Sequence, residues 1–138
     1  MTKIFCDIAD IKFIKKFNKK KIVKGFTTNP SLMRKAGAEN YLQYSKSLLN
    51  ITKLPISFEV FADNANDMIK QGILLNKLGK NVYVKVPVTN SKGNFMGNVI
   101  RELNRNKIKL NITAVYSHRQ TKKILKSIDK KTKVIISI

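Results

Sequence analysis

Six short runs of apolar and β-branched residues recur along the chain, separated by longer stretches of mixed polarity. The runs lie at residues 3–7, 22–26, 56–61, 81–87, 109–114 and 133–138. Apolar runs of this length, bounded by Gly, Pro and polar residues, are typical of strands that a parallel sheet buries on both faces. The pattern predicts an α/β protein whose six strands form one domain over residues 1–138.

The stretches between the runs carry apolar residues three or four positions apart. Ile8 to Phe17 is such a stretch, with Asp7 or Asp10 as its candidate N-cap. A second stretch opens at Asn64 and ends at Gly79, and a third covers residues 117–127. This periodicity predicts helices between the strands, in a repeated βα plan.

The chain is strongly basic, but the distribution of its charge does not indicate a dedicated nucleic-acid-binding protein. The formal net charge is +20, and only four of the 28 basic residues are arginines. Lysines occur along every predicted helix, and Lys19, Lys20 and Lys21 form one loop cluster. We interpret the excess of Lys, Asn and Ile as the codon usage of an AT-rich genome. Nonspecific association with nucleic acid at low ionic strength is the only nucleic-acid binding that we expect.

Other features restrict the function classes. Cys6 is the only cysteine, so no intrachain disulfide can form, and its place in an apolar run predicts a buried, reduced thiol. His118 is the only histidine, which argues against a Ser-His-Asp triad or a histidine metal site and predicts a solvated residue at a helix start. No apolar run approaches the roughly 20 residues of a membrane span, and no leader is visible. We expect a cytoplasmic protein without membrane contact.

Lys85 is the candidate nucleophile. It lies within the apolar run of residues 82–88, where an unpaired ammonium group would be heavily penalised. Burial favours the neutral amine, and a neutral amine can attack a carbonyl carbon to form a Schiff base. The alternative is that the side chain reaches past the strand end and keeps its charge in water.

Residues 25–31, Gly-Phe-Thr-Thr-Asn-Pro-Ser, follow the second predicted strand and precede a helical stretch. Pro30 disfavours helical backbone at Asn29, so the segment predicts a turn at the carboxyl end of a strand. Its hydroxyl and amide groups then lie where α/β proteins bind ligands. The alternative is a purely structural turn with Ser31 as the N-cap of the next helix.

Together with three further motifs in the same order, these segments resemble the transaldolase family, in its small subfamily that includes fructose 6-phosphate aldolase. The further motifs are residues 4–7, 57–60 and 111–117, and the most specific segment is residues 84–89 with Gly93. The resemblance implies a (β/α)8 TIM barrel, which acts on sugar phosphates in the pentose phosphate pathway of carbohydrate metabolism. It further implies no metal, no organic cofactor and a homo-oligomer when full length.

The resemblance also implies roles for individual residues. Lys85 would attack the C2 ketone of a sugar phosphate, and Asp7 would take the proton of the C4 hydroxyl, unless Asp7 serves only as a helix cap. Glu59 would shuttle protons during Schiff-base formation with a bound water and Thr113. The remaining positions, which would bind the substrate or the intermediate, are Thr27, Asn29 and Asn111.

Glu59 also bears on the reaction type, because the resemblance associates Glu with transaldolases and Gln with fructose 6-phosphate aldolases. Glu59 therefore favours a transferase over the alternative, an aldolase-type lyase.

The length differs from that of a complete barrel, because a (β/α)8 barrel typically needs about 250 residues and this chain has 138. We expect a barrel truncated after about six strands, with the family's phosphate-binding residues beyond Ile138 and little activity in the chain itself. The rival interpretation is an inactive remnant with a basic, non-enzymatic binding role.

Overall fold

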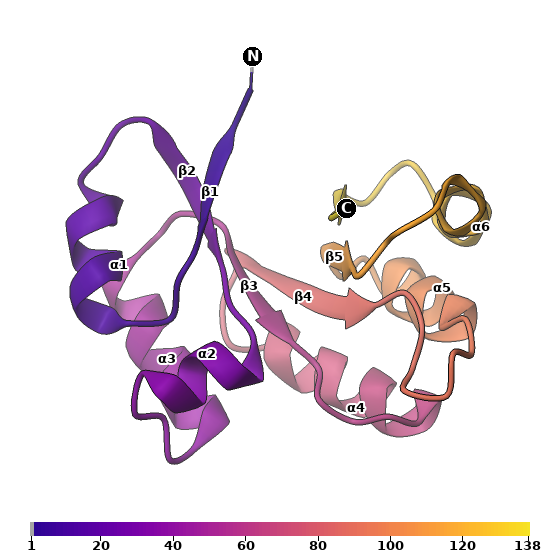
Figure 1. The fold of residues 1–138 in the computed structure, drawn as a ribbon, viewed down its shortest axis with the longest axis horizontal. Helices are drawn as coiled ribbons and strands as arrows, with labels where there is room; N and C mark the ends of the chain where they lie inside the picture. The colour runs from indigo at the N-terminus through magenta and orange to yellow at the C-terminus, as the bar shows by residue number, and fades with distance from the viewer. Residues whose placement is uncertain (1) are drawn as a thin grey trace.

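The computed structural model describes residues 2–138 and contains one sheet of six parallel strands. The strands pair in chain order, and the sheet curls into an open half-barrel (Figure 1). Its strands are β1 (Ile4–Asp7), β2 (Val23–Thr27), β3 (Ile56–Glu59), β4 (Val82–Pro87), β5 (Leu110–Thr113) and β6 (Val134–Ile136). This arrangement confirms the prediction of an incomplete (β/α)8 barrel.

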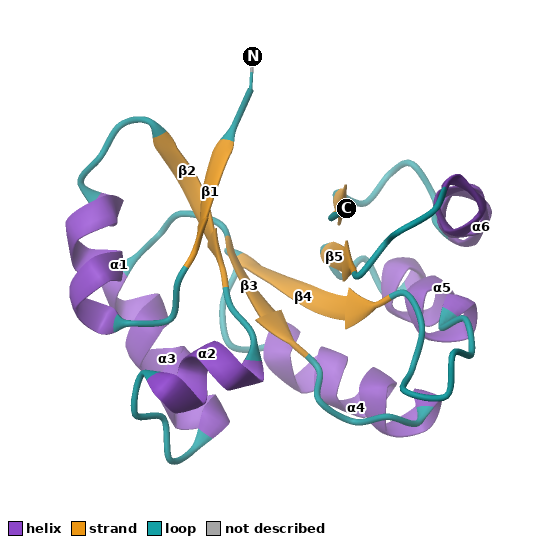
Figure 2. Ribbon diagram, viewed as in Figure 1, coloured by secondary structure: helices purple, strands orange, loops and turns teal. Residues whose placement is uncertain are grey.

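Helices connect successive strands and lie around the outside of the curled sheet (Figure 2). Five connections were expected to be helical and all are, but the connection between β2 and β3 contains two helices. The helices are α1 (Ile11–Asn18), α2 (Pro30–Lys35), α3 (Tyr41–Ile51), α4 (Ala65–Asn76), α5 (Gly97–Arg105) and α6 (His118–Ser127).

Strand register separates apolar from polar side chains on the two faces of the sheet. Phe58 pairs with Val84 across β3 and β4, and both side chains are fully buried in the core. A Cβ atom at Gly72 of α4 would lie 3.3 Å from a Val84 methyl group and 2.8 Å from a Leu103 methyl group. Glycine at this position therefore permits the close approach of α4 to the sheet and to α5. Side chains one position along each strand point to the opposite, inner face.

Several predicted boundaries are corrected by local hydrogen bonds. Helix α1 begins at Ile11 rather than Ile8, because Asp10 is its N-cap and accepts the N–H groups of the first turn. Strand β3 ends at Glu59 rather than residue 61, and Phe61 is exposed.

Two further predictions are partly wrong: α4 ends at Asn76, before Gly79, and Cys6 is half-buried rather than buried. His118, in contrast, is exposed at the start of α6, as predicted. Within residues 2–138, no helix combines the length and the apolar content that crossing a bilayer requires.

The loops at the two ends of the strands differ in charge. The five loops that lead from a helix into the next strand contain eleven lysines and one acidic residue, Asp129. We call these lysines the basic rim: Lys19, Lys20, Lys21, Lys53, Lys77, Lys80, Lys107, Lys109, Lys130, Lys131 and Lys133. The five connections that directly follow a strand, residues 8–10, 28–29, 60–64, 88–96 and 114–117, contain one lysine, Lys92. We did not predict this asymmetry from the sequence.

Candidate active site

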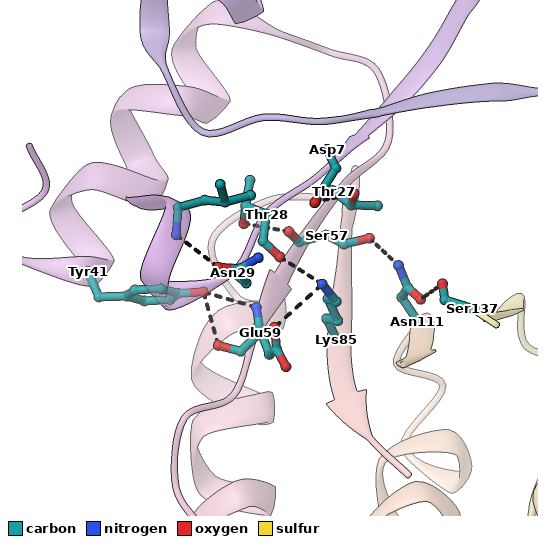
Figure 3. A network of polar contacts seen from close by, with 11 residues as sticks. Asp7, Thr27, Thr28, Asn29, Tyr41, Ser57, Glu59, Lys85, Asn111 and Ser137 are labelled. Atoms are coloured by element: carbon teal, nitrogen blue, oxygen red, sulfur yellow. Dashed lines mark hydrogen bonds and ion pairs between the residues drawn. The ribbon is translucent and has the colours of Figure 1, made fainter. Parts of the chain in front are cut away.

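Lys85 lies in β4, and its side chain is only 11% exposed. The Nζ atom donates a hydrogen bond to the backbone carbonyl of Thr28 at 3.2 Å and lies 3.5 Å from Oε2 of Glu59 (Figure 3). The alternative in which Lys85 extends to water is therefore not adopted. An amine held beside a carboxylate and away from bulk water has a nearby acceptor for its proton.

The backbone N–H and C=O groups of Glu59 bond to a tyrosine, on the side of β3 where β2 has ended. The β2–β3 pairing ends at Thr27 and Ser57, so the backbone of Glu59 extends past β2. Tyr41, at the start of α3, occupies this position: the Glu59 N–H donates to its Oη at 2.9 Å, and its O–H donates to the Glu59 carbonyl at 3.0 Å. These two bonds satisfy both backbone groups of the residue whose carboxylate faces Lys85.

Burial raises the pKa of the Glu59 carboxyl above its usual value, although the charge and hydrogen bond of Lys85 oppose the shift and the charge of Asp7 adds to it. A carboxyl with a raised pKa is a better proton acceptor when it is ionised, and it titrates closer to neutral pH. Burial also raises the pKa of Tyr41, so its hydroxyl remains protonated and continues to donate to Glu59.

Asp7 ends β1 and pairs in register with Thr27 of β2. The Thr27 hydroxyl donates to Oδ1 of Asp7 at 2.7 Å. Because Asp10 caps α1, the carboxylate of Asp7 is not used as the helix cap. The structure thus separates the two roles that the sequence left in competition.

The turn after β2 places one carbonyl and one amide near Lys85. Thr28 donates its hydroxyl to the Ser57 carbonyl at 2.8 Å, which orients its own carbonyl toward the amine. Asn29 has extended backbone, as expected before Pro30, and its Oδ1 accepts the N–H of Leu32 at 2.8 Å. Asn29 is therefore the N-cap of α2, and the alternative cap Ser31 was wrong.

Asn111 of β5 is fully buried and pairs in register with Lys85. Its Nδ2 donates to Oγ of Ser57 at 3.0 Å, and its Oδ1 accepts the hydroxyl of Ser137 at 2.7 Å. This chain of bonds joins β3, β5 and the segment after β6 across the inner face (Figure 3).

Thr113 is on the same face as Asn111, because the two residues are two positions apart in β5. It pairs in register with Pro87, which is two residues closer to the carboxyl end of β4 than Lys85. The Thr113 hydroxyl makes no hydrogen bond with any group of residues 2–138. No hydrogen bond therefore joins Thr113 to Glu59, and the proton shuttle between them remains a prediction.

Sequence reasoning did not assign site roles to Tyr41, Thr28, Ser57 and Ser137. Ser57 and Ser137 were detectable in principle, since each is two residues from a position on the inner face of its strand. Tyr41 had no such signal, because its contact with Glu59 depends on where β2 ends and how α3 packs. Within the described part of the chain, no group of three His, Cys, Asp or Glu side chains is placed to bind a metal ion.

Comparison with known proteins is consistent with this arrangement. The model of the transaldolase/fructose-6-phosphate aldolase family matches residues 4–138. A protein of Methanococcus vannielii named probable transaldolase is 40% identical over 118 residues, which cover 86% of this chain and 53% of that protein. A probable transaldolase of Paracoccus denitrificans is 44% identical over 87 residues, covering 63% of this chain and 40% of the relative. The chain thus spans about half the length of the Methanococcus relatives that it matches.

Proposed function

The chain belongs to the transaldolase/fructose-6-phosphate aldolase family, and we propose that it carries the Schiff-base centre of a transaldolase-type transferase, with Lys85 as the nucleophile. The single observation that carries this proposal is the position of Lys85 Nζ, 3.5 Å from the Glu59 carboxylate on the inner face of the half-barrel. The curated relatives named above support the same reaction class.

In the proposed reaction, the neutral amine of Lys85 attacks the C2 ketone of a ketose phosphate. Glu59 accepts the proton that Nζ releases and returns one to the departing hydroxyl, so the carbinolamine loses water and an iminium forms. Because Glu59 lies 3.5 Å from Nζ, the proton that the amine releases has an acceptor within the site. Thr113 would take part through a bound water.

Asp7 then acts as the base for carbon–carbon cleavage. It accepts the C4 hydroxyl proton, the C3–C4 bond breaks, an aldose leaves, and the bonding electrons pass to the iminium to give an enamine. The enamine carbon attacks the acceptor aldehyde, Asp7 returns its proton to the new hydroxyl, and water releases the product from Lys85. The hydrogen bond from Thr27 keeps the Asp7 carboxylate in place for both transfers.

Asn29 and Asn111 would position the sugar hydroxyls. The oxygen of Asn29 is used in the helix cap, which leaves its Nδ2 as the donor directed to a ligand. Asn111 uses one Nδ2 proton for Ser57 and retains a second for the intermediate on the adjacent Lys85. Both side-chain amides would therefore donate hydrogen bonds to the hydroxyl oxygens of the sugar.

Borohydride reduction in the presence of fructose 6-phosphate tests the proposal. We expect mass spectrometry to detect one reduced adduct on the peptide that contains Lys85, and none in Lys85→Ala. A matched Lys70→Ala change removes an exposed lysine of α4 and should leave the adduct intact. An adduct that survives Lys85→Ala would refute the assignment.

Dependence on an acceptor separates a transferase from an aldolase-type lyase. For the transferase, release of the donor's aldose stops after one equivalent and resumes when an acceptor aldose phosphate is added. Continuous release of dihydroxyacetone without an acceptor would assign the lyase instead. We further propose sugar phosphates as substrates in carbohydrate metabolism, a cytoplasmic location and homo-oligomers of the longer proteins, by analogy with the family.

A further inference from the structure

We propose that the basic rim binds the phosphodiester backbone of nucleic acid, independently of base sequence. Ten of the eleven rim lysines are exposed, and Lys109 is partly buried. The one carboxylate in these loops belongs to Asp129, and its Oδ1 accepts the backbone N–H groups of Lys131 and Thr132. The two ion pairs found within residues 2–138, Lys70–Asp67 and Lys85–Glu59, both lie away from the rim. No rim lysine therefore forms an ion pair within residues 2–138, and the eleven lysines outnumber the one carboxylate of these loops.

The rim is a continuous surface, because hydrogen bonds join neighbouring loops, and the Lys133 carbonyl of the α6–β6 loop accepts the N–H of Leu110, next to Lys109. Thr52 of the α3–β3 loop donates its hydroxyl to the side-chain oxygen of Asn18, at the end of α1, at 2.6 Å. Asn81 of the α4–β4 loop donates to the Thr52 carbonyl at 3.2 Å. Lys109 of the α5–β5 loop donates to the Lys80 carbonyl. These cross-links hold the lysines of successive loops side by side along one end of the sheet.

Crowding of like charge within the rim supports an anionic partner. The pKa of Lys109 is lowered first by burial and then by the charge of Lys133. The Nζ atom of Lys109 lies 5.1 Å from the centre of the Tyr83 ring, a contact that gives the cation only weak compensation. A phosphate group between such lysines would relieve the repulsion and release condensed counterions.

The composition of the rim favours nucleic acid over an anionic membrane surface. Stable attachment of a basic segment to a membrane requires a second contribution, such as apolar or aromatic side chains that enter the lipid. Ile22 is the only large apolar residue of these loops that is exposed, at 63%. The loops contain no aromatic residue, so bases have no stacking partner there. Contacts limited to phosphates carry no sequence information, which predicts binding without base preference.

The rim and the candidate active site lie at opposite ends of the strands. Binding to the rim therefore requires neither Lys85 nor a sugar phosphate, and the proposal stands or fails independently of the proposed enzymatic function. Lys85→Ala should leave nucleic-acid binding unchanged.

Two matched variants of the full chain test the proposal by fluorescence anisotropy with labelled oligothymidylate of about 20 nucleotides. The rim variant replaces Lys20, Lys53, Lys80 and Lys130 with Gln. The control replaces four exposed lysines on the outer helices with Gln: Lys15, Lys46, Lys122 and Lys126. Both variants lose the same charge, and circular dichroism checks that both retain the helical content of the parent chain.

We expect the rim variant to bind at least tenfold more weakly at about 50 mM salt. Its slope of log K against log salt should decrease in magnitude by about 3, from four lost phosphate contacts at roughly 0.7 each. The control should stay within about twofold, and a mixed-sequence oligonucleotide should bind like oligothymidylate. Equal losses of affinity in the two variants would show that binding depends only on the net charge of the chain, and would overturn the proposal.

A vesicle experiment distinguishes the other class of polyanion. The proposal would also be overturned if the chain bound phosphatidylserine vesicles more tightly than oligothymidylate and if Ile22→Ser abolished that vesicle binding.

Discussion

The two ends of the half-barrel arise from the same βα repeat but use lysine in opposite ways. At the carboxyl ends of the strands, Lys85 is nearly buried, and its ammonium nitrogen contacts a carbonyl and a carboxylate. At the amino ends, eleven rim lysines have no carboxylate partner among the described residues, and ten of them are exposed. The contrast shows that position relative to the strand ends, rather than residue type, decides what a lysine does in this chain.

The difference between Lys85 and the rim lysines follows from strand register and from the position of each residue in a strand or a loop. Residues 59, 85 and 111 pair in register and share the inner face, so three polar side chains from three strands meet at one level. The rim lysines belong to loops, and all of them except Lys109 are exposed to solvent. A group at the first end has many partners and is held in one geometry, whereas an exposed rim lysine such as Lys53 can be changed with little structural consequence.

Glu59→Gln should have the largest effect, because it removes the proton acceptor beside Lys85 while retaining shape. We expect the rate of adduct formation with fructose 6-phosphate and borohydride to fall about 100-fold at neutral pH, in the range typical of acid–base groups. The matched change Glu102→Gln, on the exposed face of α5, should alter the rate less than twofold. Equal effects of the two changes would remove Glu59 from the proposed mechanism.

The pH dependence of that rate should identify the same group. The proposed base is the carboxylate, and its pKa is raised by burial, so the rate should increase with pH through a value above that of an ordinary glutamate. The stability of the fold should change with pH in the opposite direction to the rate. Between the two pKa values of Glu59, the folded chain retains a proton that the unfolded chain releases. The free energy of unfolding should therefore decrease as pH rises through the raised pKa. Glu59→Gln should remove the contribution of this group to both pH dependences, as urea titrations and trapping rates of the two proteins over a pH series can test.

Asn111→Ala should destabilise the fold by about 1–3 kcal/mol, because the hydroxyls of Ser57 and Ser137 lose their buried partner. Urea unfolding monitored by circular dichroism measures this. Asn106→Ala, an exposed change near the end of α5, should cost less than about 0.5 kcal/mol. A loss at Asn111 no larger than that at Asn106 would show that the bridge across the inner face is unimportant for stability.

Tyr41→Phe should have a smaller effect on stability, about 1 kcal/mol, because the two backbone groups of Glu59 regain water as partners at this partly exposed position. It should also shift the pH dependence of adduct formation, since the Glu59 carboxylate is no longer held at one distance from Lys85. Tyr44→Phe in the same helix removes a hydroxyl that donates to the Ala9 carbonyl, and it should leave the pH profile unchanged. Identical profiles in both variants would restrict Tyr41 to a packing role.

Lys53→Gln on the rim should change the free energy of unfolding by less than about 0.5 kcal/mol, because the exposed side chain has no partner to lose. The rate of Lys85 trapping should also stay the same. A change comparable to that of Asn111→Ala would contradict the division between the two ends.

Much of the fold was predictable from the sequence, because apolar runs and helical periodicity directly report which backbone segments are buried. The strand that contains Lys85 and the helix that Asn64 caps are examples in which local pattern and tertiary position agree. Helix boundaries were less predictable, since Asp7 and Asp10 are both good caps and only backbone geometry selects Asp10.

The residues of the candidate site were predictable as a set, but their partners were not. Lys85 and Glu59 each stand out as charges in apolar strands, and their ion pair requires only that the two strands be neighbours in register. The support from Tyr41 and Ser137 depends on contacts across many residues that no local pattern encodes. The asymmetry of the basic rim was missed for a related reason, because it appears only when loops far apart in the sequence are brought to one end.

The most direct test of the account is a reactivity profile of all 24 lysines toward a small ketone. The chain would be incubated with dihydroxyacetone and borohydride at neutral pH, and peptide mass spectrometry would follow the label at each lysine over time. Lys85 has a proton acceptor 3.5 Å away, so it should be labelled at least tenfold faster than any rim lysine. Labelling that is uniform, or that favours the rim and spares Lys85, would contradict the assignment of Schiff-base chemistry to this end of the sheet.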